Sequence, residues 1–319
     1  MKILVTGAAG QLGSALLRAL ASRTDTTEIV AVDQHPLATD SPKLRVLTGD
    51  LTAPGFARGL VDRGTATVFH LASLVSGGAE QDFELGTRVN LDATRELLEA
   101  CRIAGHAPRF VFTSSIAVYG GTLPDPVTDD TPTLPRLSYG AQKLACEILI
   151  NDYTRRGFLV GATLRLPAVL VRGGGPNSAV SGWTSALIRE PLAGRDYVCP
   201  VAARTRQPCI SARRAVESLI AASRLDPGAL GHDRSVLLAG VTATAGEMYE
   251  AARRAAGGMP FGRVEFRPDD RIQAVMDGVP QATRSRRAAR LGFAPSRDID
   301  EIVAEYVADH LSVPTPERP

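Results

Sequence analysis

The 319-residue chain lacks several features that would each point to a particular class of protein. It has no apolar stretch long enough to span a membrane, and the strand-like start at Met1 has no signal-peptide pattern. The net charge is only +2, so nucleic acid is not an expected partner. The densest basic run, residues 284–287, is typical of a solvated helix face. We therefore expect a cytoplasmic protein that binds neither membrane nor nucleic acid.

Cysteine and histidine patterns that hold metals are also missing. The chain has four cysteines and no C-x-x-C pair among them, and no two histidines have the spacing of a zinc site. Free thiols in a reducing compartment are the simplest interpretation. We expect no metal site.

Short apolar segments alternate with helix-like ones over the first half of the chain. Continuous apolar strands separated by helices indicate a parallel sheet covered on both faces. Right-handed crossovers make this a doubly wound α/β sheet of Rossmann type. The expected strands are 2–6, 28–32, 44–47, 67–71, 109–113 and 160–166, and the clearest helices are 11–22, 88–103 and 139–155. Residues 211–225 and 236–239 are expected to return to the sheet.

The pattern changes after Pro167, where the chain becomes irregular and rich in glycine and proline. We expect residues 1–168 to form the dinucleotide-binding domain, with 207–240 returning to its sheet. Residues 169–206 and 241–313 would form a smaller, mostly helical substrate lobe, and 314–319 a flexible tail.

The first expected strand runs into a glycine loop, Thr6-Gly7-Ala8-Ala9-Gly10-Gln11-Leu12-Gly13. This G-x-x-G-x-x-G spacing between a strand and a helix is a variant of the dinucleotide fingerprint. Its glycines let the backbone approach a pyrophosphate, and the first helical turn, with Gln11 and Leu12, presents free N–H groups to the anion. The loop predicts a dinucleotide cofactor.

Asp33 ends the second expected strand, twenty residues after Gly13. A carboxylate there can bind both ribose hydroxyls of NAD and would repel the 2′-phosphate of NADP. No arginine follows at Gln34 or His35 to hold that phosphate. NAD is therefore the expected cofactor, although Asp33 could also be a turn residue before Pro36.

Further cofactor contacts are expected where other strands end, because ligands of open α/β sheets bind at the carboxyl ends of strands. Asp50 and Leu51 follow the third strand, and Leu71, Ala72 and Ser73 follow the fourth. Each of these residues could alternatively serve packing.

Tyr139, Lys143 and Ser115 have the spacing of a proton-transfer site. Tyr139 and Lys143 are four residues apart, so they share a helix face, and Ser115 lies twenty-four residues before the tyrosine. An ammonium beside a phenol favours the phenolate and lowers its pKa. Such a base can take the proton of an alcohol. Together with the glycine loop, this predicts hydride transfer between an alcohol and a nicotinamide.

Taken together, these motifs resemble the extended short-chain dehydrogenase/reductase family, also called the NAD-dependent epimerase/dehydratase family. The resemblance implies that Ser115 is the catalytic hydroxyl, Tyr139 the acid/base, and Lys143 the residue that holds the nicotinamide ribose. It also implies cofactor contacts at Pro167 and at Asn90, although the role of Asn90 could instead be structural. It further implies a homodimer joined through helices 88–103 and 139–155. The matching positions are 6–13, 33, 50–51, 70–72, 90, 114–120, 139 and 143, 165–167 and 290–295.

Two departures bear on which reaction of this family to expect. Ile116 and Ala117 stand where sugar-nucleotide dehydratases carry an acidic pair, and 167–169 lacks the asparagine that many nucleotide-sugar epimerases use. The runs 75–77, 82–83, 139–143, 151–153, 164–167, 176–177 and 188–192 instead resemble the D-erythronate dehydrogenase branch, from which the chain departs at Gly173 and Trp183.

That likeness implies NAD-dependent oxidation of the C2 hydroxyl of a small sugar acid to a 2-oxo acid. A substrate carboxylate needs a cation, for which Arg172 is the first candidate and Arg189 the second. Ser76 and Asn177 are further substrate candidates. A nucleotide-sugar epimerase that retains its NAD is the alternative, while a non-catalytic NAD sensor would be expected to have lost Ser115, Tyr139 or Lys143.

Overall fold

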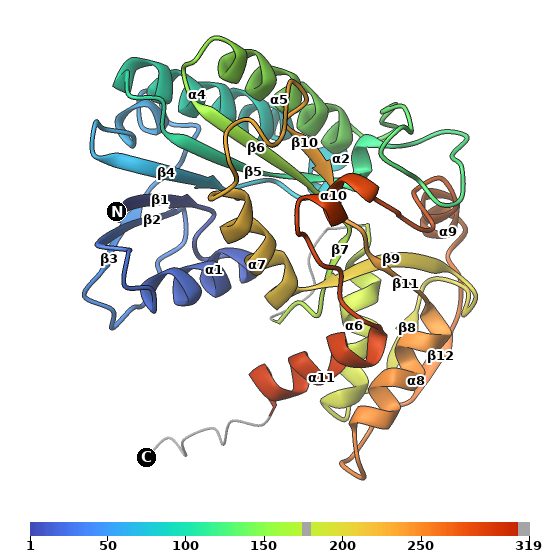
Figure 1. Ribbon diagram of the computed structural model, residues 1–319. Helices are drawn as coiled ribbons and strands as arrows, with labels where there is room; N and C mark the ends of the chain where they lie inside the picture. Colours follow the sequence, from blue (N-terminus) through green and yellow to red (C-terminus); the bar gives the residue numbers. More distant parts are fainter. Residues whose placement is uncertain (174–179, 312–319) are drawn as a thin grey trace.

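A seven-stranded sheet forms the centre of the computed structural model, which describes residues 1–173 and 180–311 (Figure 1). The strand order is β3-β2-β1-β4-β5-β6-β10, and all neighbouring pairs are parallel. The expected doubly wound Rossmann-type sheet is confirmed. Its strands are β1 (Lys2–Thr6), β2 (Glu28–Asp33), β3 (Leu44–Thr48), β4 (Thr65–His70), β5 (Arg109–Ser115), β6 (Val160–Leu166) and β10 (Ser235–Leu237).

Helices cover both faces of this sheet, which is why its inner strands are almost continuously apolar. On one face α1 (Gln11–Ala21) packs beside α7 (Ala212–Ala222), and on the other α4 (Ala93–Ala104) packs beside α5 (Ser138–Arg155) (Figure 1). Short helical segments complete this part: η1 (Ala57–Gly59), α2 (Ser76–Gln81), α3 (Phe83–Gly86), η2 (Thr87–Asp92) and η3 (Ile116–Val118).

The expected helix 88–103 is not one regular α-helix. Its first part, η2, is a π-helix, and α4 begins only at Ala93. The Asn90 carbonyl accepts the hydroxyl of Thr94 at 2.7 Å and the thiol of Cys146 at 3.2 Å. These side-chain bonds compete with the regular helical bond at this carbonyl, and such wider turns recur at functional sites.

A second lobe packs around its own core, with Trp183, Met248 and Tyr306 among the buried residues. It contains a three-stranded sheet of β7 (Ala168–Leu170), β9 (Arg206–Ser211) and β11 (Val241–Thr244), and a two-stranded sheet of β8 (Tyr197–Cys199) and β12 (Val264–Phe266). The remaining helices of the chain, which are not all in this lobe, are α6 (Gly182–Leu192), α8 (Ala245–Ala255), α9 (Asp270–Asp277), α10 (Arg286–Arg290) and α11 (Ile299–His310).

The chain passes between the two lobes more often than the sequence suggested. Strand β9 pairs in the small sheet, although it begins the stretch expected to return to the large one. Ala288 and Phe293 pack in the core under α1 and α7, although they lie in the stretch expected to belong to the second lobe. Strand β9 lies in the small sheet because it finds its hydrogen-bonding partners in β7 and β11.

All four cysteines are buried and unpaired, as expected from their spacing. Within residues 1–173 and 180–311, no helix has both the length and the apolar character needed to cross a membrane.

Candidate active site

The glycine loop after β1 makes a turn that side chains would block. Gly7 has a φ of +70°, and a Cβ there would lie 2.6 Å from the backbone nitrogen of Ala72. A Cβ on Gly13 would lie 2.1 Å from the Gly7 carbonyl oxygen, so α1 can approach the strand only without that side chain. The loop therefore forms the close-packed cradle that a pyrophosphate requires.

A cavity of about 360 Å³ extends from this loop along the carboxyl ends of β1, β2 and β4. The Asp33 carboxylate is fixed at its rim, because its oxygens accept the backbone N–H groups of Ala9 and His35, both at 3.0 Å. Asp50 is fixed likewise by the N–H of Thr52 at 2.8 Å. The predicted cofactor residues that line this cavity are Gly7, Gly10, Asp33, Asp50, Leu51, Leu71, Ala72 and Ser73.

Gln11 and Leu12 do not line this cavity. The Gln11 amide donates to the Val171 carbonyl at 2.5 Å, and Leu12 packs against the core under α1. Gln11 and Leu12 can therefore contribute to a cofactor site only through the backbone of the first turn of α1. The cradle, the fixed carboxylate and the elongated cavity together fit a dinucleotide.

Asn90 is buried behind the loop that follows β4. Its amide oxygen accepts from the Ser73 hydroxyl and the Leu74 N–H, both at 2.8 Å, and its nitrogen donates to Leu74 and Gln142. Asn90 lines neither this cofactor cavity nor the cavity that contains Ser115 and Tyr139. Of the two roles left open by the sequence, these bonds favour the structural one: Asn90 shapes the loop that carries Ser73.

His70 lies beneath the same loop, between two threonines. Because the Thr94 hydroxyl donates to the Asn90 carbonyl, it accepts from His70 Nε2 at 2.8 Å. His70 Nδ1 then accepts the Thr6 hydroxyl at 2.6 Å. Complete burial lowers the pKa of His70 to about 3, and the charge of Lys143 adds to that shift. His70 is therefore a neutral structural residue.

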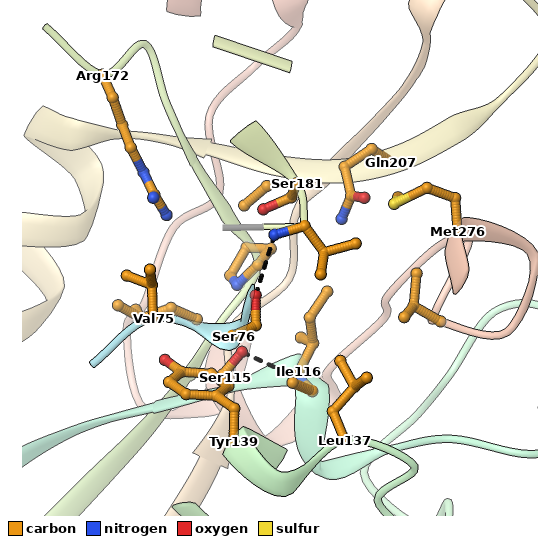
Figure 2. A pocket seen from close by; sticks show the side chains of 16 residues that line it. Val75, Ser76, Ser115, Ile116, Leu137, Tyr139, Arg172, Ser181, Gln207 and Met276 are labelled. Carbon is orange, nitrogen blue, oxygen red and sulfur yellow. Dashed lines mark hydrogen bonds between the residues drawn. The ribbon is translucent and has the colours of Figure 1, made fainter. Parts of the chain in front are cut away.

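Ser115 and Tyr139 come together in a smaller cavity of about 110 Å³ between the two lobes (Figure 2). Ser115 ends β5, and its hydroxyl accepts the Ala117 N–H at 3.1 Å. Tyr139 lies in the first turn of α5. Further along α5, Glu147 forms a buried ion pair with Arg165 of β6 at 2.6 Å, which fixes the helix on the sheet. The cavity is lined by Val75, Ser76, Ser115, Ile116, Ala117, Leu137, Tyr139, Leu166, Pro167, Ala168, Arg172, Val180, Ser181, Gln207, Met276 and Val279.

Lys143 is fully buried one turn beyond Tyr139. Its Nζ lies 4.6 Å from the centre of the Phe112 ring and 5.6 Å from that of the Tyr139 ring. Burial lowers the pKa of Lys143 to about 8, although Cys146 and Glu147 oppose this shift. Lys143 therefore shares a helix face with Tyr139, as the spacing predicted.

The electrostatics of Tyr139 differ from the expectation that Lys143 lowers its pKa. Burial raises the pKa of the phenol above its usual range. The main opposing influence is the positive charge of Arg172, followed by hydrogen bonding with Ser73 and Ser115. The sequence missed this because Arg172 lies thirty-three residues after Tyr139 and comes close only in the fold.

Arg172 and Arg189, the two candidate carboxylate ligands, have different surroundings. Arg172 is half-buried in the cavity wall, and among the described residues no carboxylate pairs with its guanidinium. Arg189 does not line the cavity: its guanidinium pairs with Glu190 at 2.8 Å and donates to the Arg172 carbonyl at 2.8 Å. Arg189 therefore positions Arg172, and it does not have the free guanidinium expected of a carboxylate ligand.

The other two substrate candidates, Ser76 and Asn177, differ in whether the structure places them at the cavity. Ser76 lines the cavity, and its hydroxyl accepts the Val180 N–H at 3.1 Å, which joins the two lobes (Figure 2). Asn177 lies outside the described residues.

The cavity residues from the second lobe that were not predicted from the sequence are Ala168, Val180, Ser181, Gln207, Met276 and Val279. Gln207 gave no clear signal in the sequence, because its strand also contains the polar residues Arg206 and Ser211. These residues line the same cavity as Tyr139 only because of how the lobes pack.

Comparison with known proteins agrees with this geometry. The family model "NAD dependent epimerase/dehydratase family" matches residues 3–223. D-erythronate dehydrogenase of Cupriavidus necator is 45% identical over 97% of this chain and 98% of its own, and that of Haemophilus influenzae is 34% identical over 96% and 99%. The crystal structure of the nucleoside-diphosphate-sugar epimerase from Agrobacterium tumefaciens superposes with a TM-score of 0.91, at 40% identity over 98% of this chain and 94% of that one.

The fold and the site define an enzyme that acts on a CH–OH group with a nicotinamide dinucleotide. The chain belongs to the NAD-dependent epimerase/dehydratase family, and it is an oxidoreductase.

Proposed function

We propose that the protein oxidises the C2 hydroxyl of a small sugar acid, D-erythronate or a close relative, to a 2-oxo acid with NAD as the acceptor. The names of the two D-erythronate dehydrogenases, which match this chain over nearly its whole length, support this assignment.

One observation carries the proposal: the half-buried guanidinium of Arg172 lies in the same cavity as Tyr139 and influences its pKa. A planar guanidinium can hold a carboxylate by two parallel hydrogen bonds. An acid bound in this way would hold the hydroxyl next to its carboxylate near the phenol. The cavity of about 110 Å³ that these groups line is compatible with a four-carbon acid.

Tyr139, as phenolate, takes the proton of the C2 hydroxyl, and Ser115 hydrogen-bonds and orients the same oxygen. Arg172 favours the phenolate by its charge. Lys143, one turn along α5, is the residue that holds the nicotinamide ribose. When bound, the nicotinamide supplies the acceptor for the hydride that leaves C2.

Asp33 supports NAD over NADP as the cofactor. Its carboxylate is held by two backbone N–H groups at the rim of the cofactor cavity. A carboxylate in this place can accept the ribose hydroxyls of NAD, whereas the 2′-phosphate of NADP would meet a like charge.

A nucleotide-sugar epimerase is the second candidate, favoured by the Agrobacterium tumefaciens structure and its name. It would use the same Tyr139 and Ser115 and retain the reduced cofactor between two half-reactions. The two D-erythronate dehydrogenases that match this chain over nearly its whole length support the acid over a nucleotide sugar.

The carbon that is oxidised can be tested with D-erythronate deuterated at C2. We expect deuterium to appear in the NADH that forms, and turnover to slow if hydride transfer limits the rate. NADH that forms without deuterium would show that another carbon is oxidised. Tightly bound NAD without net reduction by any acid would favour the epimerase.

A further inference from the structure

Gln207 is a buried amide in the wall of the cavity that contains Ser115 and Tyr139. It lies on β9 in the second lobe with 3% of its surface exposed. Its amide nitrogen makes one long hydrogen bond, to the Pro208 carbonyl at 3.4 Å. Its amide oxygen is buried and has no hydrogen-bond donor among the described residues. Buried amides are rarely left in this state without a reason.

Apart from Ser181, the side chains labelled near Gln207 are apolar: Met276 lies beside it and Leu137 lines the wall below (Figure 2). Val279 also lines this cavity. A leucine or valine at this position would fit such surroundings better, because an amide here loses its hydration without gaining good partners. A polar residue at this position is explained if a polar group of a bound ligand forms the hydrogen bonds that the Gln207 amide lacks.

Besides the hydroxyls of Ser76 and Ser181, the cavity has polar groups in three places, which Figure 2 shows apart from one another. Tyr139 and Ser115 lie on the floor, Arg172 lies on one side, and Gln207 lies on the opposite side. A substrate with its carboxylate at Arg172 and its C2 hydroxyl at Tyr139 would therefore extend its far end toward Gln207.

We propose that Gln207 recognises a hydroxyl on the C3–C4 end of the substrate and so selects polyhydroxy acids over simple 2-hydroxy acids. This inference rests on the proposed function. Figure 2 shows the amide nitrogen facing the cavity and the oxygen turned toward Met276. A hydroxyl both donates and accepts, so it can bind the nitrogen as it stands, or the oxygen after a half-turn of the amide.

The test compares D-erythronate with (R)-2-hydroxybutanoate, which has the same four carbons and no hydroxyl at C3 or C4. The Gln207→Leu variant keeps similar bulk and removes the amide. We expect the ratio of kcat/KM for D-erythronate over the deoxy acid to fall by roughly 10- to 100-fold relative to wild type. If the deoxy acid is not turned over, competitive inhibition constants replace its kcat/KM.

Stability gives a second readout. Because the Gln207 oxygen has no donor, replacing this amide by leucine leaves the Tm unchanged or higher. Gln273 is the matched control, since its amide oxygen accepts the Ala202 N–H at 2.9 Å and it does not line the cavity. The Gln273→Leu variant lowers the Tm and leaves the ratio between the two acids unchanged.

An equal loss for both acids in Gln207→Leu, or no loss for either, would overturn the inference while leaving the proposed function standing. A wild-type protein that oxidises neither acid would instead remove the proposed function, and this inference with it.

Discussion

Replacing Arg172 with glutamine tests two consequences of its position at once. Arg172 is half-buried beside Tyr139, its carbonyl is held by Arg189, and its charge opposes the rise in the pKa of the phenol. The Arg172→Gln variant therefore loses both the proposed carboxylate ligand and the charge that favours the phenolate. We expect weaker substrate binding together with a changed pH profile.

The size of the binding loss follows from the hydrogen bonds removed. A hydrogen bond to a charged group contributes about 1.5–3 kcal/mol. Loss of this interaction corresponds to a rise in KM of about 10- to 150-fold for D-erythronate. Part of this loss would appear in kcat if the guanidinium also orients C2 toward Tyr139.

The pH profile gives the second part of the prediction. In the proposed mechanism Tyr139 is the base, so activity rises as pH increases through its pKa in the site. Removing the positive charge of Arg172 raises that pKa further, because Arg172 is the main influence that opposes burial. The acidic limb of the log kcat/KM profile therefore moves to higher pH in Arg172→Gln.

The Arg172→Lys variant separates charge from geometry. It keeps the positive charge and loses the planar fork that holds a carboxylate by two bonds. We expect a raised KM with the acidic limb near its wild-type position. The reasoning is wrong if Arg172→Gln has a wild-type KM for the acid, or if its acidic limb does not move.

The remaining predictions concern the base, the cofactor, a buried histidine and the surface. Tyr139→Phe should lower kcat by about 10²- to 10⁴-fold while NAD still binds in calorimetry; near wild-type turnover would exclude it as the base. Asp33→Asn should lower the NAD-to-NADP ratio of kcat/KM by roughly tenfold or more, and an unchanged ratio would contradict its role. Burial lowers the pKa of His70 from its usual 6.5 to about 3, so the stability it contributes is present above pH 6.5 and is lost as pH falls toward 3. Urea unfolding should therefore show a loss of up to about 1.4 kcal/mol per pH unit below 6.5 that is absent in His70→Asn. We propose that α4 and α5 form a dimer contact, since Ile103 and Ile148 are 59% and 62% exposed on them; Ile148→Glu should then halve the mass found by light scattering.

The fold of the first half of the chain could be predicted, because each strand and helix there is marked by residues close to it in the sequence. Strands β1 and β6 have the bounds that the sequence predicted, and α1 and α5 differ from prediction by one residue at one end. Each is an apolar run or an apolar helix face between clear turn residues. The π-helix at η2 could not be predicted, since it depends on bonds from Thr94 and Cys146 to one carbonyl.

Some residues of the candidate site could likewise be identified from the sequence, and others could not. Ser115, Tyr139, Lys143 and the glycine loop could be found from spacing within short segments. The distinction between Arg172 and Arg189 could not, because it depends on which guanidinium finds a carboxylate in the folded second lobe. Gln207 was missed for the same reason: its place opposite Arg172 appears only when β9 pairs beside β7.

The most direct test of the central claim is to mix the purified protein with NAD and a panel of four-carbon sugar acids and to follow NADH at 340 nm by its absorbance. We expect NADH to accumulate with D-erythronate or a close stereoisomer, to be released, and to be absent with Tyr139→Phe. No NADH with any acid, together with interconversion of UDP-sugars by protein that retains its own NAD, would contradict the account.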